Sequence, residues 1–341
     1  MAESRTATAP STPPPHEQIL NIVMGFWHSR ALAVATELEL AELLADGPLP
    51  VEILASRTQT DPLSLFRLMR ALESLGIFKQ VSPRLFANTP ASECLRRNAP
   101  ASQWAPVQTI LSVGHGQYEA WAGLLDGLRT GKTAFDAQFG CPYWQWLQRN
   151  PGISEVFNET TRAMGITIAP AVAAAYDWGR FPVIADIGGG IGGQLTTILN
   201  AHSSCRGILF DRADVISKAP PHDRVERIGG DFFKSVPAGA DAYILRWVIH
   251  DWNDPDAIAI LKNVRQPMKA GSRVMLIEEL VPDPPKPTMG MWLDPHMLIM
   301  AGGRERTAAE YRELYANAGL ALENIVSTAS LHSIIVGRRR D

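Results

Sequence analysis

Acidic residues stand beside three apolar, strand-like runs of the sequence, and the first run leads directly into a glycine-rich loop. The acids are Asp186, Asp211 and Asp231, and the loop is residues 188–193. In open α/β sheets, ligands bind beyond the carboxyl ends of the strands. Glycines at that place let backbone amides approach a ligand where a helix begins. The pattern therefore predicts a site for a nucleoside-type cofactor, the alternative being an ordinary turn.

The glycine loop by itself fits two kinds of cofactor. Gly188, Gly190 and Gly193 match the GxGxxG fingerprint of dinucleotide-binding proteins. Together with Asp186, the glycines 188, 190 and 192 match the acidic-xGxGxG loop of methyltransferases. A nicotinamide cofactor brings a pyrophosphate, which Asp186 would repel. S-adenosylmethionine brings an ammonium and a sulfonium, which an acidic rim attracts. The acids therefore favour S-adenosylmethionine, with a nicotinamide-dependent dehydrogenase as the alternative.

The other two acids are spaced to hold the rest of such a cofactor. Asp211 lies 23 residues after Gly188, a distance that suits a carboxylate gripping ribose hydroxyls in either reading of the loop. Asp231 is placed to accept a hydrogen bond from an adenine amino group. Phe232, the next residue, would then lie beside the adenine ring.

One of the eight histidines is placed to act as a base. His250 follows the apolar run 244–249, at the edge where the cofactor is expected, and precedes Asp251 and Trp252. Most histidines are surface or capping residues, but this position favours a reactive one. Histidine suits proton transfer near neutral pH, because its ordinary pKa of about 6.5 lies close to that pH.

Nearby carboxylates are candidates to orient this histidine. Because neighbouring strand residues point to opposite faces, only one of Glu278 and Glu279 can face His250. Glu305 lies between two arginines, where it either joins the site or belongs to an exposed charged run.

Six segments, in this order along the chain, resemble the S-adenosylmethionine-dependent O-methyltransferases of the plant caffeic-acid and bacterial antibiotic-tailoring type. They are ADIGGG (185–190), LFDRADV (209–215), GGDFF (229–233), LRWVIHDWND (245–254), EELVP (278–282) and GGRERT (302–307). The pairing of HDW with GGRERT is the most specific part. The resemblance extends to the N-terminal region, which is similar to the family's dimerisation domain.

The resemblance implies roles for particular residues. Cofactor binding falls to Gly188, Asp211, Asp231, Phe232 and Arg246, together with Asp186 and Gly190 of the loop. His250 would be the catalytic base, flanked by Glu278, which the family motif selects by its distance from Pro282, and by Glu305. Arg246 stands where the plant enzymes often carry lysine, so the charge is kept but its reach differs.

The same resemblance implies the reaction and the methyl acceptor. It implies transfer of a methyl group from S-adenosylmethionine to a hydroxyl of a small aromatic natural product, without a metal, leaving S-adenosylhomocysteine. It places Phe157, Met164 and Met297 near the acceptor ring, and His296 where a substrate carboxylate or hydroxyl could bind. Methionines and aromatics at helical spacing are usually core residues, so packing is the alternative for each.

Length and pattern predict two domains in the 341 residues. Residues 1–15 are Pro-rich with little to bury and predict a disordered tail. Residues 16–100 read as three helices and a small hairpin, a winged-helix-like pattern that the resemblance makes a dimerisation domain. Residues 101–341 form the expected methyltransferase domain, of which 101–178 are helical and aromatic and lead to the acceptor pocket.

From residue 181 onward, strands and helices alternate. Five strand-like runs are expected at 183–187, 206–210, 225–229, 242–246 and 273–278, with helices at 254–269 and 308–318. Two final β-prone runs, 321–327 and 331–337, are separated by only three residues and predict an antiparallel hairpin. The fold class is therefore α/β, a doubly wound Rossmann-like sheet with an antiparallel C-terminal hairpin, beside the mostly helical N-terminal domain.

Composition argues against several other classes of protein. The formal charge is −3, which is unsuited to binding nucleic acid, and no run reaches the roughly 18 apolar residues of a membrane span. Three scattered cysteines make neither a disulfide framework nor a zinc site. The first residues lack the pattern of a signal peptide, so a cytoplasmic protein is expected.

Two further functions stay open at this point. A winged-helix regulator is one, although the segment 62–75 offers only Arg67 and Arg70 among its leucines. The other is an S-adenosylmethionine-binding tailoring enzyme that decarboxylates or hydroxylates. The apolar segments 19–44 and 62–75 exceed what a small module buries alone, so a homodimer is expected.

Overall fold

The computed structural model describes residues 13–340, and the chain divides into two compact units, one ending at Ser112 and the other beginning at Val113. Most of the tail expected at residues 1–15 lies outside the described residues. Helix α1 begins at Pro15, one residue earlier than expected, because proline is well suited to the first helical position. The sequence placed the domain boundary at residue 100. Val107 and Leu111 of the following helix pack into the N-terminal core, so that helix belongs to the first unit.

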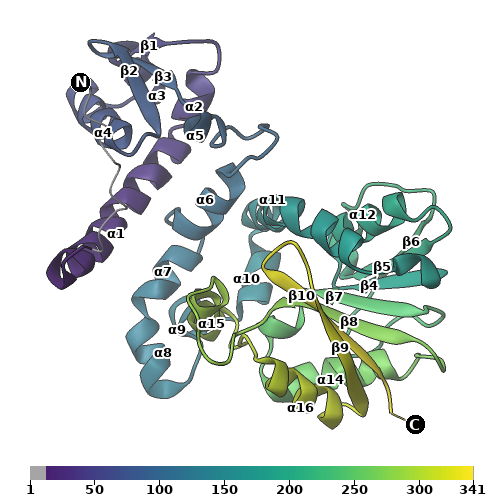
Figure 1. Ribbon diagram of the computed structural model, residues 1–341. Helices are drawn as coiled ribbons and strands as arrows, with labels where there is room; N and C mark the ends of the chain where they lie inside the picture. The colour runs from purple at the N-terminus through teal and green to yellow at the C-terminus, as the bar shows by residue number, and fades with distance from the viewer. Residues whose placement is uncertain (1–12, 341) are drawn as a thin grey trace, which may run out of the picture. The chain divides into compact units, whose positions relative to one another are not determined.

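The N-terminal unit consists of helices around a three-stranded sheet with strand order β1-β3-β2 (Figure 1). The helices are α1 (Pro15–Glu37), α2 (Leu40–Leu43), α3 (Val51–Thr58), α4 (Pro62–Ser74), α5 (Pro90–Glu93) and α6 (Trp104–Leu111). The strands are β1 (Leu49–Pro50), β2 (Phe78–Ser82) and β3 (Leu85–Asn88). Asp61 caps α4 by accepting a hydrogen bond from the Ser64 amide at 2.8 Å, as the Asp-Pro pair predicts.

The second unit begins with a helical, aromatic segment. Its helices are α7 (Gln117–Ala122), α8 (Leu124–Thr130), α9 (Ala134–Phe139), α10 (Tyr143–Arg149) and α11 (Pro151–Ala175), followed by the short 3-10 helix η1 (Trp178–Arg180). Phe135 and Tyr143 form the centre of an aromatic cluster that also includes Ile299 and Met300 of helix α15 (Gly290–Met300). The cluster therefore joins these helices to a segment far along the chain.

A seven-stranded sheet with order β6-β5-β4-β7-β8-β10-β9 forms the centre of this unit. The strands are β4 (Val183–Ile187), β5 (Arg206–Asp211), β6 (Val225–Gly229), β7 (Ala242–Arg246), β8 (Arg273–Glu279), β9 (Leu320–Ser327) and β10 (His332–Arg339). The first five are parallel, and β10 runs antiparallel between β8 and β9. The expected fold class, including the C-terminal hairpin, is confirmed.

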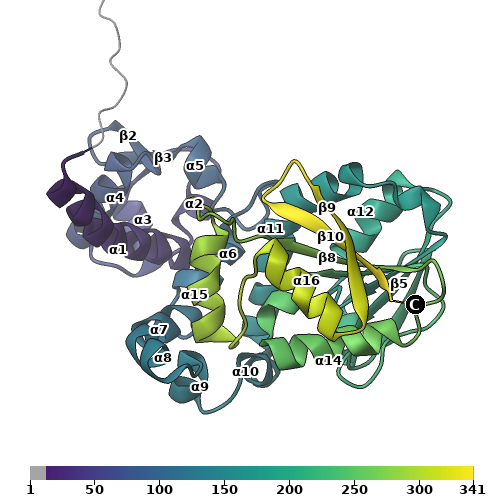
Figure 2. The same ribbon diagram turned by 60° about the horizontal axis from the view of Figure 1, so that its bottom comes forward.

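Helices cover both faces of the sheet, as Figure 2 shows. One core contains residues of α14 (Asp254–Arg265) and α16 (Ala308–Asn317), and the other contains residues of α11 and α12 (Gly193–Ala201). Strands β4, β7 and β8 are buried along nearly their whole length, which explains why they read as continuous apolar runs. The short elements α13 (Ala213–Ile216) and η2 (Ile249–Asp251) complete the unit.

One expected helix is shorter in the structure. The segment 254–269 was expected to be helical throughout, but α14 ends at Arg265. Pro267 explains the difference, because proline has no backbone N–H with which to continue the hydrogen bonds of the helix.

The strand order determines where a ligand site can form. The chain passes from β4 to β5 on one side and later returns to place β7 on the other side of β4. Such a reversal opens a crevice at the carboxyl ends of the two central strands. The glycine loop follows β4 at this point, and Arg246 ends β7 beside it.

Candidate active site

The first acid of the glycine loop is enclosed. Asp186 is 1% exposed, and within residues 13–340 neither of its carboxylate oxygens has a hydrogen-bond partner in good geometry. Burial raises the pKa of Asp186 to about 7, although the Arg246 charge and the nearby Leu195 amide offset part of this effect. A buried, unpartnered carboxylate of this kind is suited to a positively charged ligand.

The loop itself has the backbone angles that require glycine. Gly188 and Gly190 have φ values of +69° and +59°. A side chain at Gly188 would meet Val248 at 2.8 Å, whereas the space beside Gly190 is open to at least 4 Å. The second expected acid lies against this loop, because the Gly190 amide donates to Asp211 Oδ2 at 2.8 Å. Burial raises the pKa of Asp211, while its bonds to the backbone amides work in the opposite direction.

The third strand end is more open. Asp231 is exposed, accepts a hydrogen bond from the Phe233 amide at 2.9 Å and has Lys234 Nζ at 3.7 Å. Phe232 lies edge-on to Trp252, and its ring would be 3.6 Å from a side chain placed at Gly188. The structure therefore brings Phe232 to the glycine loop and leaves Asp231 at its outer rim.

Arg246, the last residue of β7, lies against helix α11 and within electrostatic range of Asp186. Its guanidinium packs over the Trp247 ring and lies so close to Gly165 of α11 that a side chain there would meet Nη1 at 2.8 Å. Its Nη1 is buried and has no hydrogen-bond partner in the part of the chain that the structure describes. Burial lowers the pKa of Arg246, and the nearby carboxylates of Asp186 and Glu278 partly offset this.

His250 lies on η2, directly after β7, and carboxylates surround its buried ring. Its Nδ1 is 2.6 Å from Glu305 Oε1 and 3.9 Å from Glu278 Oε2. On the other side of the ring, Nε2 is 3.6 Å from Asp251 Oδ1. The bond to Glu305 therefore directs Nδ1–H toward the carboxylate and leaves Nε2 facing away from Glu305.

Strand alternation separates the two consecutive glutamates of β8. Glu278 Oε1 accepts hydrogen bonds from the Val248 and Ile249 amides at 3.3 and 3.0 Å, so its carboxylate is fixed beneath η2. Glu279 points to the opposite face and accepts a bond from the Gly290 amide at 2.7 Å. Only one of the two glutamates faces His250, as the alternation required, and it is Glu278.

The charges of the cluster shift each other's ionisation. Burial alone would lower the pKa of His250, but the carboxylates of Glu278, Glu305 and Asp251 outweigh it and raise this pKa to about 10. Burial raises the pKa values of Glu278 and Asp251, each to about 7, against the opposing effect of His250. The cluster as a whole carries more acid than base, which favours a cation nearby.

A second segment is fastened onto η2, and the sequence did not single out the residues that do this. Arg306 is 1% exposed and donates to the carbonyl oxygens of Ile249 and Trp252 at 3.2 and 2.8 Å, and to Asp254 at 2.7 Å. The Arg304 amide donates to the His250 carbonyl at 2.9 Å. Gly303 lies so close that a side chain would come within 2.0 Å of that same carbonyl. In the sequence, Gly303, Arg304 and Arg306 appeared only as members of the GGRERT motif, without a contact assigned to any of them.

The residues expected at the acceptor ring come from two helices. Phe157 packs edge-on to Tyr143 and Trp144 at the edge of the aromatic cluster, and Met164, further along α11, is 43% exposed. Met297 of α15 is buried, as a core residue would be. Phe157 and Met297 therefore lie in packing contacts, whereas the Met164 side chain is exposed to solvent.

His296 of α15 is held in one tautomer. Trp121 Nε1 donates to its Nδ1 at 3.1 Å, so the remaining ring proton is on Nε2. Burial and then the charge of His250 lower the pKa of His296 to about 4. His296 is therefore a neutral donor in the electrostatic range of His250.

His332 of β10 is a further buried histidine that the sequence did not indicate. Trp247 Nε1 donates to its Nε2 at 2.6 Å, and Trp247 has a φ of +54°, where the chain turns from β7 into η2. Burial lowers the pKa of His332 to about 4, with the Arg246 and His250 charges acting in the same direction.

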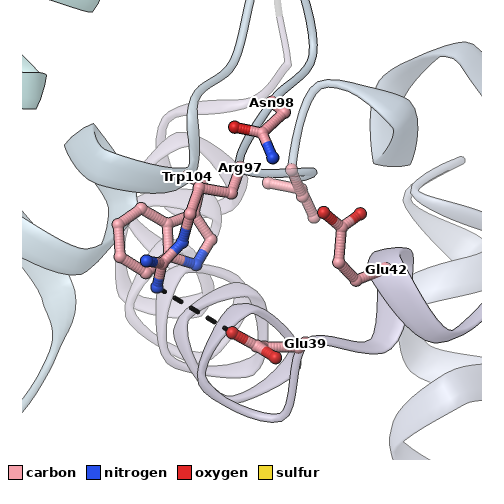
Figure 3. Close-up of a pocket in the computed structure, with 6 residues that line it drawn as sticks. Glu39, Glu42, Arg97, Asn98 and Trp104 are labelled. Carbon is pink, nitrogen blue, oxygen red and sulfur yellow. Dashed lines mark ion pairs between the residues drawn. The ribbon is translucent and has the colours of Figure 1, made fainter.

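A cavity of about 230 Å³ lies elsewhere, in the N-terminal unit (Figure 3). Arg97 stacks 3.8 Å from the Trp104 ring centroid and pairs with Glu39 at 3.9 Å, while Glu42 pairs with Arg96 at 2.8 Å. The charged side chains that line this cavity already have partners of opposite charge, and none of the candidate active-site residues lines it.

A metal site and a membrane-spanning helix are two further features to consider in this chain. Within residues 13–340, no group of three or more His, Cys, Asp or Glu side chains is arranged to hold a metal ion. Over the same range, the helices lack the length and apolar character that crossing a bilayer requires.

Comparison with known families decides between the possible readings of this site. Residues 121–321 match the model of the O-methyltransferase domain, and residues 20–98 match that of the O-methyltransferase dimerisation domain. The chain belongs to the O-methyltransferase family. The resemblance read from the six motifs is thereby confirmed.

Curated relatives of this O-methyltransferase cover nearly its whole length. It is 40% identical to the phenazine O-methyltransferase PhzM of Lysobacter antibioticus, over 94% of this chain and 95% of that protein. It is 31% identical to the phenazine-1-carboxylate N-methyltransferase of Pseudomonas aeruginosa, over 94% and 96%. Transfer to oxygen and transfer to nitrogen therefore both occur among its relatives.

Solved structures agree with this family. The crystal structure of LaPhzM matches with a TM-score of 0.92 and 38% identity, covering 96% of this chain and all of that chain. The O-methyltransferase NcsB1 of neocarzinostatin biosynthesis, in complex with S-adenosylmethionine and 2-hydroxy-5-methyl naphthoic acid, matches with a TM-score of 0.81 and 31% identity, covering 92% and 96%.

The buried carboxylate of Asp186 leads to a prediction about the stability of this O-methyltransferase. In the folded chain the pKa of Asp186 is about 7 against 3.8 for the free side chain, so its contribution to stability falls as pH rises from about 4 through 7. Asp186→Asn removes the charge, and we expect it to raise the melting temperature at pH 8 more than at pH 5. Calorimetry without cofactor measures this, with the exposed Asp223→Asn as control. An equal shift at both pH values would contradict the ionised state of Asp186.

Proposed function

We propose that this O-methyltransferase transfers a methyl group from S-adenosylmethionine to a hydroxyl of a small aromatic natural product, with His250 as the general base. The observation that carries this proposal is the buried 2.6 Å contact between His250 Nδ1 and Glu305, at the cofactor edge of the sheet. A carboxylate on one ring nitrogen fixes the tautomer and makes the other nitrogen the proton acceptor.

The residues around the crevice fit the cofactor. S-adenosylmethionine, when bound, supplies the methyl group on a positively charged sulfonium. The orphaned carboxylate of Asp186 and the open space at Gly190 suit the charged amino-acid end, and the unpartnered Arg246 Nη1 suits its carboxylate. Asp211 retains lone pairs for ribose hydroxyls, because a carboxylate accepts about four hydrogen bonds and two amides use only part of this capacity.

Adenine would then lie toward the outer rim of the crevice. Phe232 offers a ring beside Gly188, and the exposed carboxylate of Asp231 can accept a hydrogen bond from an amino group. The exposed position of Asp231 makes it the weakest of the proposed contacts, since solvent competes for the same bond.

His250 would move one proton. The acceptor's O–H proton passes to Nε2, and the resulting imidazolium is stabilised by Glu305 and Glu278. The raised pKa of His250 means that the ring is already protonated in the free enzyme at neutral pH. A cationic cofactor lowers this pKa by repulsion, so its binding would prepare the ring to accept the acceptor's proton.

The acceptor would bind between α11 and α15. The exposed Met164 and the aromatic cluster around Phe157 provide an apolar wall, and His296, fixed by Trp121, offers a neutral N–H donor. An apolar site around the acceptor favours methyl transfer, because the negative phenolate and the positive sulfonium neutralise each other in the transition state. We assign the acceptor to aromatic hydroxyl compounds on this basis, with support from the naphthoate bound by NcsB1.

Transfer to nitrogen is the second candidate, because a relative methylates phenazine-1-carboxylate on nitrogen. A ring nitrogen with a lone pair has no proton to lose, so such a reaction needs no base. The buried His250–Glu305 pair favours the hydroxyl acceptor.

The first test of the proposed function is His250→Ala. We expect turnover to fall by roughly 10²-fold or more at pH 7 on a phenol of pKa about 10, because proton removal then depends on water. The loss should shrink as the acceptor's own pKa approaches the assay pH. Methyl-transfer rates on a series of phenols and naphthols measure this dependence. Near-full activity of His250→Ala on the least acidic phenol would remove His250 as the base, and equal losses on all acceptors would point to a structural role.

The second test concerns the cofactor. Asp211→Ala should weaken S-adenosylmethionine binding by about tenfold or more, the loss expected for one charged hydrogen bond of roughly 1.5 kcal/mol. Calorimetric titration measures the affinity, and Asp214→Ala, an exposed acid three residues further on, is the matched control. Unchanged affinity in Asp211→Ala would exclude the contact to ribose.

The N-terminal unit supports a further part of the proposal, a homodimer. Helix α1 exposes a row of apolar side chains, each 55–74% exposed: Ile19, Leu20, Ile22, Val23, Phe26 and Trp27. Exposed apolar surface of this extent marks an interface. The match of residues 20–98 to the dimerisation domain covers the same helix.

Light scattering at micromolar concentration tests the dimer. The measured mass should be twice the 37.3 kDa of the chain, and the double variant Ile22→Glu/Phe26→Glu should shift it toward the monomer because it puts charges into the contact. Arg67→Glu, an exposed charge change on α4, serves as control. A monomeric wild-type protein at this concentration would contradict the proposal.

A further inference from the structure

Glu305 holds His250, yet little holds the Glu305 carboxylate itself. Its Oε1 bonds His250, and its buried Oε2 has no hydrogen-bond partner among the described residues. The Glu278 carboxylate, by contrast, accepts two backbone amides. The direction of the Glu305 side chain therefore depends on where its backbone is placed.

One side chain bonds the backbone of Glu305 directly. The Glu305 amide donates to Asp294 Oδ1 at 2.9 Å, and Asp294 belongs to α15. The flanking residues Arg304 and Arg306 are fixed to η2, as described above, so the Asp294 contact fills the remaining position between them. Loss of that contact would leave a partly buried amide unsatisfied and free the segment to shift.

Helix α15 is itself anchored to β8, the strand that carries Glu278. Its first residue, Gly290, donates its amide to the buried carboxylate of Glu279 on β8. The two consecutive glutamates of β8 thus reach His250 by different routes. Glu278 faces the ring, and Glu279 fixes the helix whose Asp294 holds Glu305.

We propose that Asp294 is a positioning residue that holds Glu305 against His250, and that it links the acceptor-side helix α15 to the base. This inference rests on the proposed function, because it assumes that the Glu305–His250 pair does the proton transfer. Two residues after Asp294, the same helix carries His296, which faces the acceptor in that proposal. An acceptor bound against α15 would therefore act on the orientation of Glu305 through one hydrogen bond. A displacement of about 1 Å in such a group is enough to cost roughly 10²-fold in rate.

The test follows the ionisation of His250 in the free protein, without cofactor or acceptor. NMR titration of isotope-labelled histidines gives its midpoint, and His250→Gln identifies the signal. Among the described residues, five titratable groups interact electrostatically with this ring: Glu278 from β8, Glu305, Asp251 on η2, His296 from α15 and His332 from β10. Of these, only Glu305 is bonded to Asp294 among the described residues.

We expect Asp294→Ala to lower the midpoint of His250 by about one pH unit or more, because Glu305 moves away from Nδ1. Asp294→Asn keeps an oxygen acceptor for the amide and should leave the midpoint close to that of the wild type. The exposed Glu313→Ala is the control for removal of an acid. An unchanged midpoint in Asp294→Ala would overturn the proposal. Equal shifts in the Ala and Asn variants would also overturn it, since Asp294 would then act by its charge alone.

Kinetics separate this inference from the proposed function. Asp294→Ala should lower kcat on a weakly acidic phenol, with little effect on cofactor affinity, and Asp294→Asn should restore most of it. If His250→Ala kept its activity, the base would be lost from the mechanism, while the titration would still decide whether Asp294 positions Glu305. Melting temperatures of both variants check that each is folded.

Discussion

The site depends on one buried interaction, the bond between His250 Nδ1 and Glu305. A histidine and a carboxylate enclosed together are stable only if both are placed accurately, because burial is costly for each charge. The surrounding structure supplies that placement from three directions. Strand β7 delivers His250, β8 places Glu278 beneath it, and Arg306 fastens the segment of Glu305 onto η2. The central strands of a doubly wound sheet provide the rigid edge on which these segments meet.

The same crevice carries more buried acid than its own cations neutralise. Burial raises the pKa values of Asp186, Asp251 and Glu278 to about 7. Arg246, near Asp186 and Glu278, has a buried N–H without a partner among the described residues. This arrangement is unfavourable for an empty site and favourable for a ligand that carries both a positive centre and a carboxylate. S-adenosylmethionine has both, so its binding would relieve the strain that the free chain bears. Under the proposed binding of the cofactor, stability and cofactor affinity are opposed at these positions.

The fold could be read largely from the sequence because its signals are local. Apolar runs ending in acids marked the strand ends, and strand alternation alone predicted that one of two adjacent glutamates would face His250. The missed features are long-range. No pattern near Asp294 indicates that it bonds Glu305. The GGRERT motif contains Arg306 but does not show that this side chain reaches the carbonyl oxygens of Ile249 and Trp252. Pro267 is a local signal for the end of α14, but the helical periodicity of the segment predicted a longer helix.

The most direct test of the account is a crystal structure of the enzyme with S-adenosylhomocysteine and a phenolic acceptor. The measurement is the distance from His250 Nε2 to the acceptor hydroxyl oxygen, with Glu305 still bonded to Nδ1. The account predicts a hydrogen bond of about 2.6–3.2 Å, in line with the position of the departed methyl group. A productively placed hydroxyl that lies beyond hydrogen-bond reach of Nε2, with no bridging water, would contradict it.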